Sequence, residues 1–194
     1  MKVTAALAEK ITVTLVSRGM IPEGDAGLHR YGIENGIMVA GNLLASLVFG
    51  LVTGRLGNIL VFLFFYGALR SFSGGIHCKN RTGCFTASIL TLFIPAYLCD
   101  WAIKIPFVAV IIGGITAMVV ILALSPVESV NKSLDNEDWD YCRRMSRCIA
   151  GWQVCTLVTL YCIDRLDYFY AGYSSLVLVA VFLIVGKLTT KHRN

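Results

Sequence analysis

The hydrophobic and polar positions of this 194-residue chain divide it into one short amphipathic segment and six long apolar runs. In the first segment, residues 2–18, apolar side chains recur at four-residue intervals, which places them on one face of a helix. These side chains are Val3, Leu7, Ile11 and Leu15. Gly19 and Pro22 end the pattern. It predicts an amphipathic helix that lies in a membrane interface, packs against the rest of the protein, or does both.

The six apolar runs are candidates for membrane-spanning helices. They cover residues 33–53, 57–69, 84–103, 105–124, 148–163 and 168–187. Most approach the length of about 20 residues that crosses about 30 Å of hydrocarbon. The run 57–69 is shorter, about 20 Å at a rise of about 1.5 Å per residue. We therefore expect either a short helix with Arg70 reaching the surface or a helix that continues into residues 71–76.

The composition supports a membrane protein. The chain is 56% hydrophobic and 15% charged, and a soluble domain of this length has too much surface to bury that much apolar side chain. We predict an all-α polytopic membrane protein, with an interfacial helix at 1–20 and one helical domain of about six transmembrane segments at 21–194. Glu9 and Lys10 interrupt the N-terminal segment, so we expect no cleavable signal peptide. The seven cysteines are an odd number, which favours reduced thiols over a disulfide framework.

Basic residues are distributed unevenly along the chain. With the N-terminus inside and six crossings, the only Lys and Arg residues that fall outside are Arg55, Lys104 and Arg165, although the chain has 17 in all. The positive-inside rule therefore places both termini and the longer polar loops in the cytoplasm. No basic cluster has interleaved aromatic residues, so the partner that the charge implies is membrane lipid and not nucleic acid.

The candidate chemistry lies in the stretch from Arg70 to Cys84. A Gly-rich polar loop carries His77, and a thiol and an imidazole at the edge of a membrane segment are the minimum parts of a cysteine nucleophile with its base. Seven cysteines also make a nearby His–Cys pair a plausible coincidence, so spacing alone leaves the catalytic interpretation open. Cys84 opens an apolar run after Asn80 and Thr82, either of which suits a helix N-cap. The first turn of a helix should lower the pKa of the thiol.

The spacing of this pair predicts a bend in the chain. One continuous helix would separate the Cα atoms of His77 and Cys84 by about 10.5 Å. Their side chains and one hydrogen bond together span about 9–9.5 Å. We therefore predict a helix break within residues 78–83, at Asn80 and Gly83, and a new helix that carries Cys84.

Two stripes predict helix packing. Small residues recur at four-residue intervals at Gly32, Gly36 and Ala40, and again at Gly50 and Gly54. This spacing indicates close helix contacts within the bundle or, alternatively, a homodimer seam. A second stripe, spaced by seven residues, consists of Cys148, Cys155 and Cys162. We interpret it as a helix contact, because a metal site needs tighter clustering of ligands; we expect neither metal nor cofactor.

The polar motifs resemble those of the accessory gene regulator B (AgrB) family. The matching residues are Arg70, Gly75, His77, Cys84 and the segment Pro126–Lys132. Members of that family are membrane endopeptidases of Gram-positive bacteria. They process a propeptide, AgrD, into a cyclic autoinducing peptide for quorum sensing. The resemblance covers most of the chain in length and hydropathy.

The resemblance implies a set of roles for these residues. His77 and Cys84 would be the catalytic pair, forming a thioester that an internal Cys or Ser of an AgrD-like propeptide displaces to close a thiolactone or lactone. From the residues themselves, Gly74 and Gly75 either let the backbone approach the oxyanion or the extended substrate, or simply form a turn. Basic side chains would attract an acidic substrate tail; these are Arg70, Lys132, Arg143, Arg144 and Arg147.

Two other classes remain open. A non-enzymatic transporter or peptide-binding scaffold would be favoured by ionisable residues within the spans, of which Glu34 is the clearest. A lipid-modifying transferase would need paired carboxylates for a metal, and the acidic run 135–140 has no matching cluster elsewhere.

Overall fold

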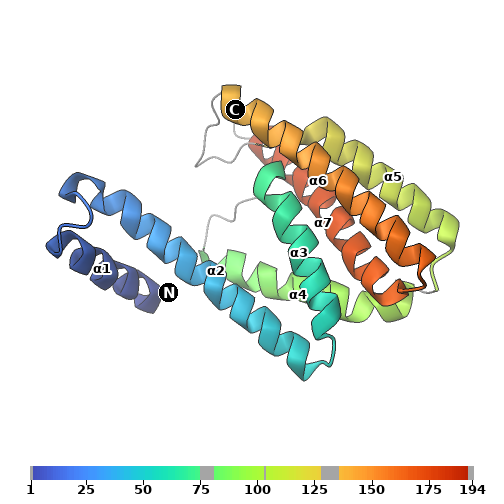
Figure 1. Ribbon diagram of the computed structural model, residues 1–194, viewed down its shortest axis with the longest axis horizontal. Helices are drawn as coiled ribbons and strands as arrows, with labels where there is room; N and C mark the ends of the chain where they lie inside the picture. The colour runs from blue at the N-terminus through green and yellow to red at the C-terminus, as the bar shows by residue number, and fades with distance from the viewer. Residues whose placement is uncertain (1, 75–80, 103, 128–135, 192–194) are drawn as a thin grey trace.

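The computed structural model describes residues 2–74, 81–102, 104–127 and 136–191 of the chain, without some of the side chains near the ends of these ranges. Within them the protein is all-α, as predicted, and contains no strand (Figure 1). A single 3-10 turn, Glu23–Asp25, precedes the second helix. The helices are α1 (Lys2–Ser17), α2 (Ala26–Val52), α3 (Leu56–Ser73), α4 (Arg81–Ala102), α5 (Phe107–Leu124), α6 (Asn136–Cys162) and α7 (Leu166–Lys191).

Helix α7 forms the centre of the bundle. In its most apolar stretch 56% of the residues are buried, against 11% for α2 and 17% for α5. It packs against α3, α4, α5 and α6 (Figure 1). The main core combines residues of four helices: Leu69, Ala117, Ile121, Ala150, Leu176, Val179, Ala180 and Leu183. The apolar run that ends the chain therefore supplies most of the internal packing surface.

The outer surface of the bundle is apolar, as lipid requires. Leu44, Val52 and Ile115 are each largely exposed, together with many similar side chains of α2 and α5. Among the described residues, four segments are long and apolar enough to cross a membrane: Glu23–Val52, Leu56–Ser73, Phe107–Leu124 and Leu166–Thr189. The prediction of a polytopic membrane protein is confirmed. Helix α4 contributes a shorter apolar stretch, and α6 is more polar, so crossings by these two helices stay predictions.

Helix α3 resolves the alternatives for the short second run. It continues past Arg70 to Ser73, which gives 18 residues and a length of about 27 Å. That length is close to the thickness of the hydrocarbon core. The helix ends at Gly74, whose backbone has φ 70° and ψ −149°.

Helix α1 packs against the first half of α2, and this hairpin projects from the other helices (Figure 1). Among the described side chains of α1, Ala8 and Thr12 are buried, whereas Leu7 and Ile11 of the predicted apolar stripe are exposed. The small face of α1 therefore meets the protein, and the large apolar side chains remain free to contact lipid. Helix α1 therefore packs on α2, and both its packing on the membrane bundle and its interfacial position stay predictions.

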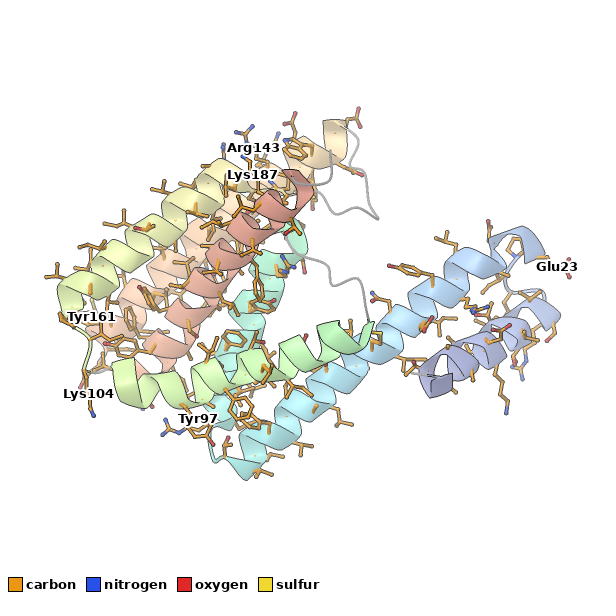
Figure 2. The ribbon with its side chains drawn as sticks, turned by 180° about the vertical axis from the view of Figure 1, so that it is seen from behind. Glu23, Tyr97, Lys104, Arg143, Tyr161 and Lys187 are labelled. Carbon is orange, nitrogen blue, oxygen red and sulfur yellow. The ribbon has the colours of Figure 1, made fainter. Side chains whose placement is uncertain are left out.

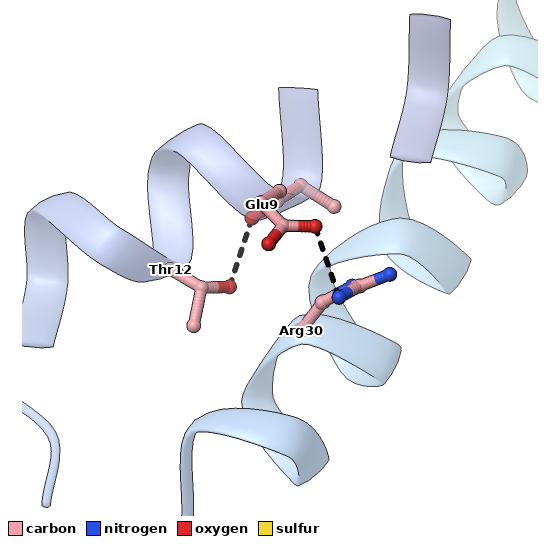
Figure 3. A network of polar contacts seen from close by, with 4 residues as sticks. Glu9, Thr12 and Arg30 are labelled. Carbon is pink, nitrogen blue, oxygen red and sulfur yellow. Dashed lines mark hydrogen bonds and ion pairs between the residues drawn. The ribbon is translucent and has the colours of Figure 1, made fainter. Parts of the chain in front are cut away.

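Polar contacts fix the position of α1 on α2. Arg30 of α2 forms an ion pair with Glu9 of α1 at 2.9 Å, between side chains that are both about half exposed (Figure 3). The hydroxyl of Thr12 donates to the carbonyl oxygen of Ala8 at 2.8 Å within α1 (Figure 3). The buried hydroxyl is thus satisfied inside its own helix and does not disturb the seam.

The predicted stripe of small residues packs within the chain only in part. Gly32, Gly36 and Ala40 are exposed, and a Cβ atom added to Gly32 or Gly36 would meet nothing within 4 Å. The expectation that they pack inside the bundle is therefore wrong, because α2 meets its neighbours on another side; a homodimer seam stays a prediction. Gly50 does pack closely, since an added Cβ would lie 3.0 Å from the Cα atom of Leu56.

The cysteine stripe of α6 also faces outward. Cys148, Cys155 and Cys162 are free thiols and exposed, so the expected helix contact is wrong. The buried residues of α6 are Ser146, Ala150, Gln153 and Leu157. Cys148 and Cys155 each lie two residues after one of these, which is about 200° around the helix. Cys162 lies five residues after Leu157, which is about 140° around it. The contact surface of α6 is thus on the side opposite the cysteines.

Candidate active site

Two polar loops, far apart in sequence, meet at one end of the bundle. The amide of Val127, which follows α5, donates to the carbonyl oxygen of Ser73 at 3.0 Å. Gly74 and Val127 form a single parallel bridge there. The start of the Pro126–Lys132 segment therefore lies beside the end of α3. The sequence marked both loops as candidates but gave no sign that they pair.

Three buried serines connect these loops to α6. Ser125 donates its hydroxyl to Ser146 Oγ at 2.7 Å, and the hydroxyls of Ser73 and Ser146 lie 2.9 Å apart. At most 4% of each residue is exposed. Ser146 was missed by the sequence analysis; the available signal was its position on the less polar face of α6, four residues before Ala150. We name Ser73, Ser125 and Ser146 the serine cluster.

Gly74 lets the loops approach each other. Its φ and ψ lie in a region that is essentially restricted to glycine. A Cβ atom on this residue would overlap the carbonyl oxygen of Val127. Gly74 is therefore required for the turn itself.

Arg70 supports the same turn from the last part of α3. Its Nη1 donates to the carbonyl oxygen of Gly74, and its guanidinium lies 5.5 Å from the centre of the Phe182 ring on α7. A cation is also favourable at the C-terminal end of a helix. These contacts hold the loop to α3 and α7. The role of Arg70 in substrate binding stays a prediction.

Basic side chains gather at this end of the bundle. Arg143, Arg144 and Arg147 are exposed on the first half of α6, and Arg147 donates from Nη2 to the carbonyl oxygen of Leu122, near the end of α5, at 3.3 Å. Figure 2 shows Arg143 and Lys187 at this end, with Lys104 at the opposite one. We name this region the basic end.

Cys84 lies at the start of a separate helix. Because α4 begins at Arg81, Cys84 is in its first turn, and α3 ends before it, at Ser73. The predicted break at Gly83 is wrong, because Gly83 lies inside α4, and a break at Asn80 stays a prediction. Thr82 lies inside α4, so the prediction that it caps the helix is wrong. Other predicted residues lie outside the described residues: Gly75, His77, Asn80 and Lys132, as does the side chain of Cys84.

The structure separates the predicted site residues into two groups. Arg70, Gly74 and the arginines of α6 lie at the basic end. The beginning of α4 lies against the middle of α2 and apart from the end of α3 in both views (Figures 1 and 2). Within the described ranges, no three His, Cys, Asp or Glu side chains are grouped so that they could hold a metal ion.

The comparisons with known proteins agree with this arrangement. No curated protein and no solved structure was found to match the chain. The family model described as accessory gene regulator B matches residues 8–184, from α1 to most of α7, and so includes both loops and the start of α4. The chain therefore belongs to the accessory gene regulator B family.

Proposed function

We propose that this protein is a membrane cysteine endopeptidase that cleaves the C-terminal part from an AgrD-like propeptide and supports cyclisation of the remainder. Cys84 is the nucleophile and His77 its base. Membership of the family gives the protein a role in the processing of a quorum-sensing peptide. The observation that carries the finer proposal is the fresh start of α4 at Arg81, which gives Cys84 a place in the first turn of a helix.

That place suits a reactive thiol. The unpaired amides at a helix N-terminus carry partial positive charge, which favours the thiolate over the thiol. Only the thiolate is a strong nucleophile.

The chemistry then proceeds in two transfers. His77 accepts the proton of Cys84, and the sulfur attacks the scissile carbonyl carbon. The C–N bond breaks as His77 returns the proton to the leaving amine, and a thioester with Cys84 remains. An internal Cys or Ser of the propeptide next attacks the thioester carbonyl and releases Cys84 as the thiol. The product is a thiolactone or a lactone.

The membrane surface favours cyclisation over hydrolysis. Water competes with the internal nucleophile for the thioester, and an interface lined by apolar helices limits its access. The basic end would help to bind the substrate, because its arginines attract an acidic propeptide tail. The uneven distribution of basic residues supports a cytoplasmic position for this end and for both termini. The protein then crosses the membrane six times. Its family points to the cell membrane of a Gram-positive bacterium.

Substitution of the reacting residues tests the proposal. Full-length protein in lipid nanodiscs is mixed with its propeptide, and cleavage is followed by mass spectrometry. We expect Cys84→Ala and His77→Ala to abolish cleavage. Cys78→Ala is the matched control, because it removes a thiol adjacent to His77 in the chain, and it should cleave normally.

The thioester gives a second readout. The acyl-enzyme should be trapped at Cys84 when the internal nucleophile of the propeptide is replaced by alanine. If Cys84→Ala cleaves the propeptide and Cys78→Ala does not, the nucleophile is Cys78 and the assignment to Cys84 is wrong. Propeptide binding without cleavage by the unaltered protein would favour the peptide-binding scaffold.

A further inference from the structure

A cavity of about 190 Å³ lies between α2, α3 and α4. A cavity of about 150 Å³ in another protein holds a benzene molecule, so this one has room for one large side chain. Its walls are mainly apolar, with polar groups contributed by α2 and α4. The lining residues are Val39, Asn42, Leu43, Ser46, Phe62, Leu63, Tyr66, Ser88, Thr91 and Leu92.

One polar atom of this cavity has no hydrogen-bond partner in the described part of the chain. The side-chain oxygen Oδ1 of Asn42 is shielded from solvent and unpaired there. Neighbouring hydroxyls are satisfied within their helices: Ser46 donates to the carbonyl oxygen of Asn42 at 2.7 Å, and Thr91 to that of Ser88 at 2.7 Å. An unpaired buried acceptor is unfavourable, so a rotation of the Asn42 side chain that let this oxygen accept from an N–H or O–H of an occupant would be favourable.

The cavity is close to the proposed nucleophile along α4. Ser88 and Thr91 follow Cys84 by four and seven residues, which is the spacing of one helix face. At about 1.5 Å per residue they lie about 6 and 10 Å further along the helix. An extended peptide covers about 3.3 Å per residue, so this distance corresponds to two or three residues of a substrate.

We infer that this cavity binds one side chain of the propeptide, two or three residues before the scissile bond, and thereby selects the propeptide that is processed. The inference rests on the proposed function. The occupant is a branched apolar or aromatic side chain, with a backbone N–H or polar hydrogen that pairs with Asn42. It belongs to the N-terminal side, because that part stays attached to Cys84 as the thioester and must be held until the ring closes.

Photo-crosslinking tests the placement without altering the cavity. The probes are two forms of the protein's propeptide with p-benzoylphenylalanine at the second or third position before the scissile bond. Each is bound to full-length Cys84→Ala in nanodiscs and irradiated. We expect crosslinks within 39–46 of α2, 62–66 of α3 or 88–92 of α4. Crosslinks confined to other segments would overturn the inference.

A size exchange tests selectivity. Thr91→Leu should narrow the cavity of about 190 Å³ and remove its hydroxyl, and thereby raise KM for the natural propeptide at least tenfold. The same variant should prefer a propeptide with alanine at the crosslinking position, a reversal that simple misfolding cannot produce. Thr116→Leu on α5 is the matched control, because Thr116 is exposed and makes a similar intrahelical bond to Ile112 at 2.8 Å. It should leave both substrates unchanged.

The outcomes separate the two proposals. If Thr91→Leu prefers the natural propeptide as the unaltered protein does, and cleavage still depends on Cys84, the role of the cavity is overturned. The proposal of a cysteine endopeptidase then stands. Cleavage that does not depend on Cys84 would overturn both. Labelling of the cavity by a diazirine-bearing phospholipid, unchanged by saturating propeptide, would assign it to lipid and overturn the inference.

Discussion

Gly74 joins the two polar loops through its backbone, and this predicts a sharp cost for any side chain at that position. Gly74→Ala should reduce propeptide cleavage at least tenfold, because the methyl group would overlap the carbonyl oxygen of Val127 and the φ of 70° would be strained by about 1–3 kcal/mol. Cleavage in nanodiscs measures the effect. Gly67→Ala on α3 is the control, since an added Cβ there meets nothing within 4 Å. Equal activity of both variants would contradict the close approach.

Ser146 is expected to hold the loops in place through its hydroxyl. Ser146→Ala should lower the free energy of unfolding by about 1–3 kcal/mol, because it leaves the buried hydroxyls of Ser73 and Ser125 without this partner. Thermal unfolding in nanodiscs measures the loss. Ser174→Ala provides the comparison, because Ser174 is equally buried but bonds within its own helix to Ala171. If the two variants unfold at the same temperature, the serine cluster contributes no specific stability.

Individual residues of the site were predictable where their chemistry is unusual. Arg70 and Gly74 stand in a Gly-rich polar loop between apolar runs, and the structure brings them together with the segment at Pro126. The sequence signal for Ser146 is weak. Its place four residues before Ala150 puts it on the less polar face of α6, but one serine on a helix that also carries Arg143 and Arg147 resembles a solvated residue. Its role depends on the contact between α6 and α3, which a local pattern does not specify.

At the scale of elements, Arg143 and Arg144 are expected to attract the propeptide tail, even though Glu137, Asp138 and Asp140 balance the charge of the three arginines in the first half of α6. Charge reversal at both Arg143 and Arg144 should raise KM for the propeptide about tenfold at low salt, since two exposed pairs contribute about 0.2–1 kcal/mol each and reversal adds repulsion. The effect should shrink at high salt, because the Debye length falls to about 3 Å at 1 M. Kinetics at two ionic strengths measure it. Arg165→Glu, beyond the other end of α6, is the control and should change KM little.

Most helix positions followed from the sequence, but α6 begins at Asn136, well before the apolar run predicted from residue 148, and the contact faces of two helices did not follow. Large apolar side chains such as Leu7 and Ile11 point away from the protein, whereas Ala8 and Thr12 of α1 are buried. On α6 the buried Gln153 donates to the carbonyl oxygen of Gly172 at 3.0 Å and to Ser175 Oγ at 2.7 Å. Membrane helices associate through small and polar residues, because lipid already solvates the large apolar ones. The usual association of apolar residues with a core therefore reverses in these helices.

At the scale of the whole molecule, the two ends of the bundle differ in charge. The basic end carries Arg70, the arginines of α6 and Lys187, whereas the connections at the opposite end carry Arg55, Lys104 and Arg165. Figure 2 shows Arg143 and Lys187 at one end and Lys104 at the other. Helix α7 runs from one end to the other, because it begins at Leu166 and ends at Lys191. The orientation of this one helix therefore fixes the side of the membrane on which the basic end lies.

This orientation is testable with two single-cysteine variants in a background without other cysteines. Lys104→Cys and Lys187→Cys place thiols at exposed positions on opposite ends (Figure 2). We expect a membrane-impermeant maleimide to label Lys104→Cys in intact cells and Lys187→Cys only after permeabilisation, because positive residues remain in the cytoplasm. Labelling of Lys187→Cys alone in intact cells would invert the orientation and place the basic end outside. Labelling of both in intact cells would contradict the crossing of the membrane between them, which the length and apolarity of α7 otherwise require.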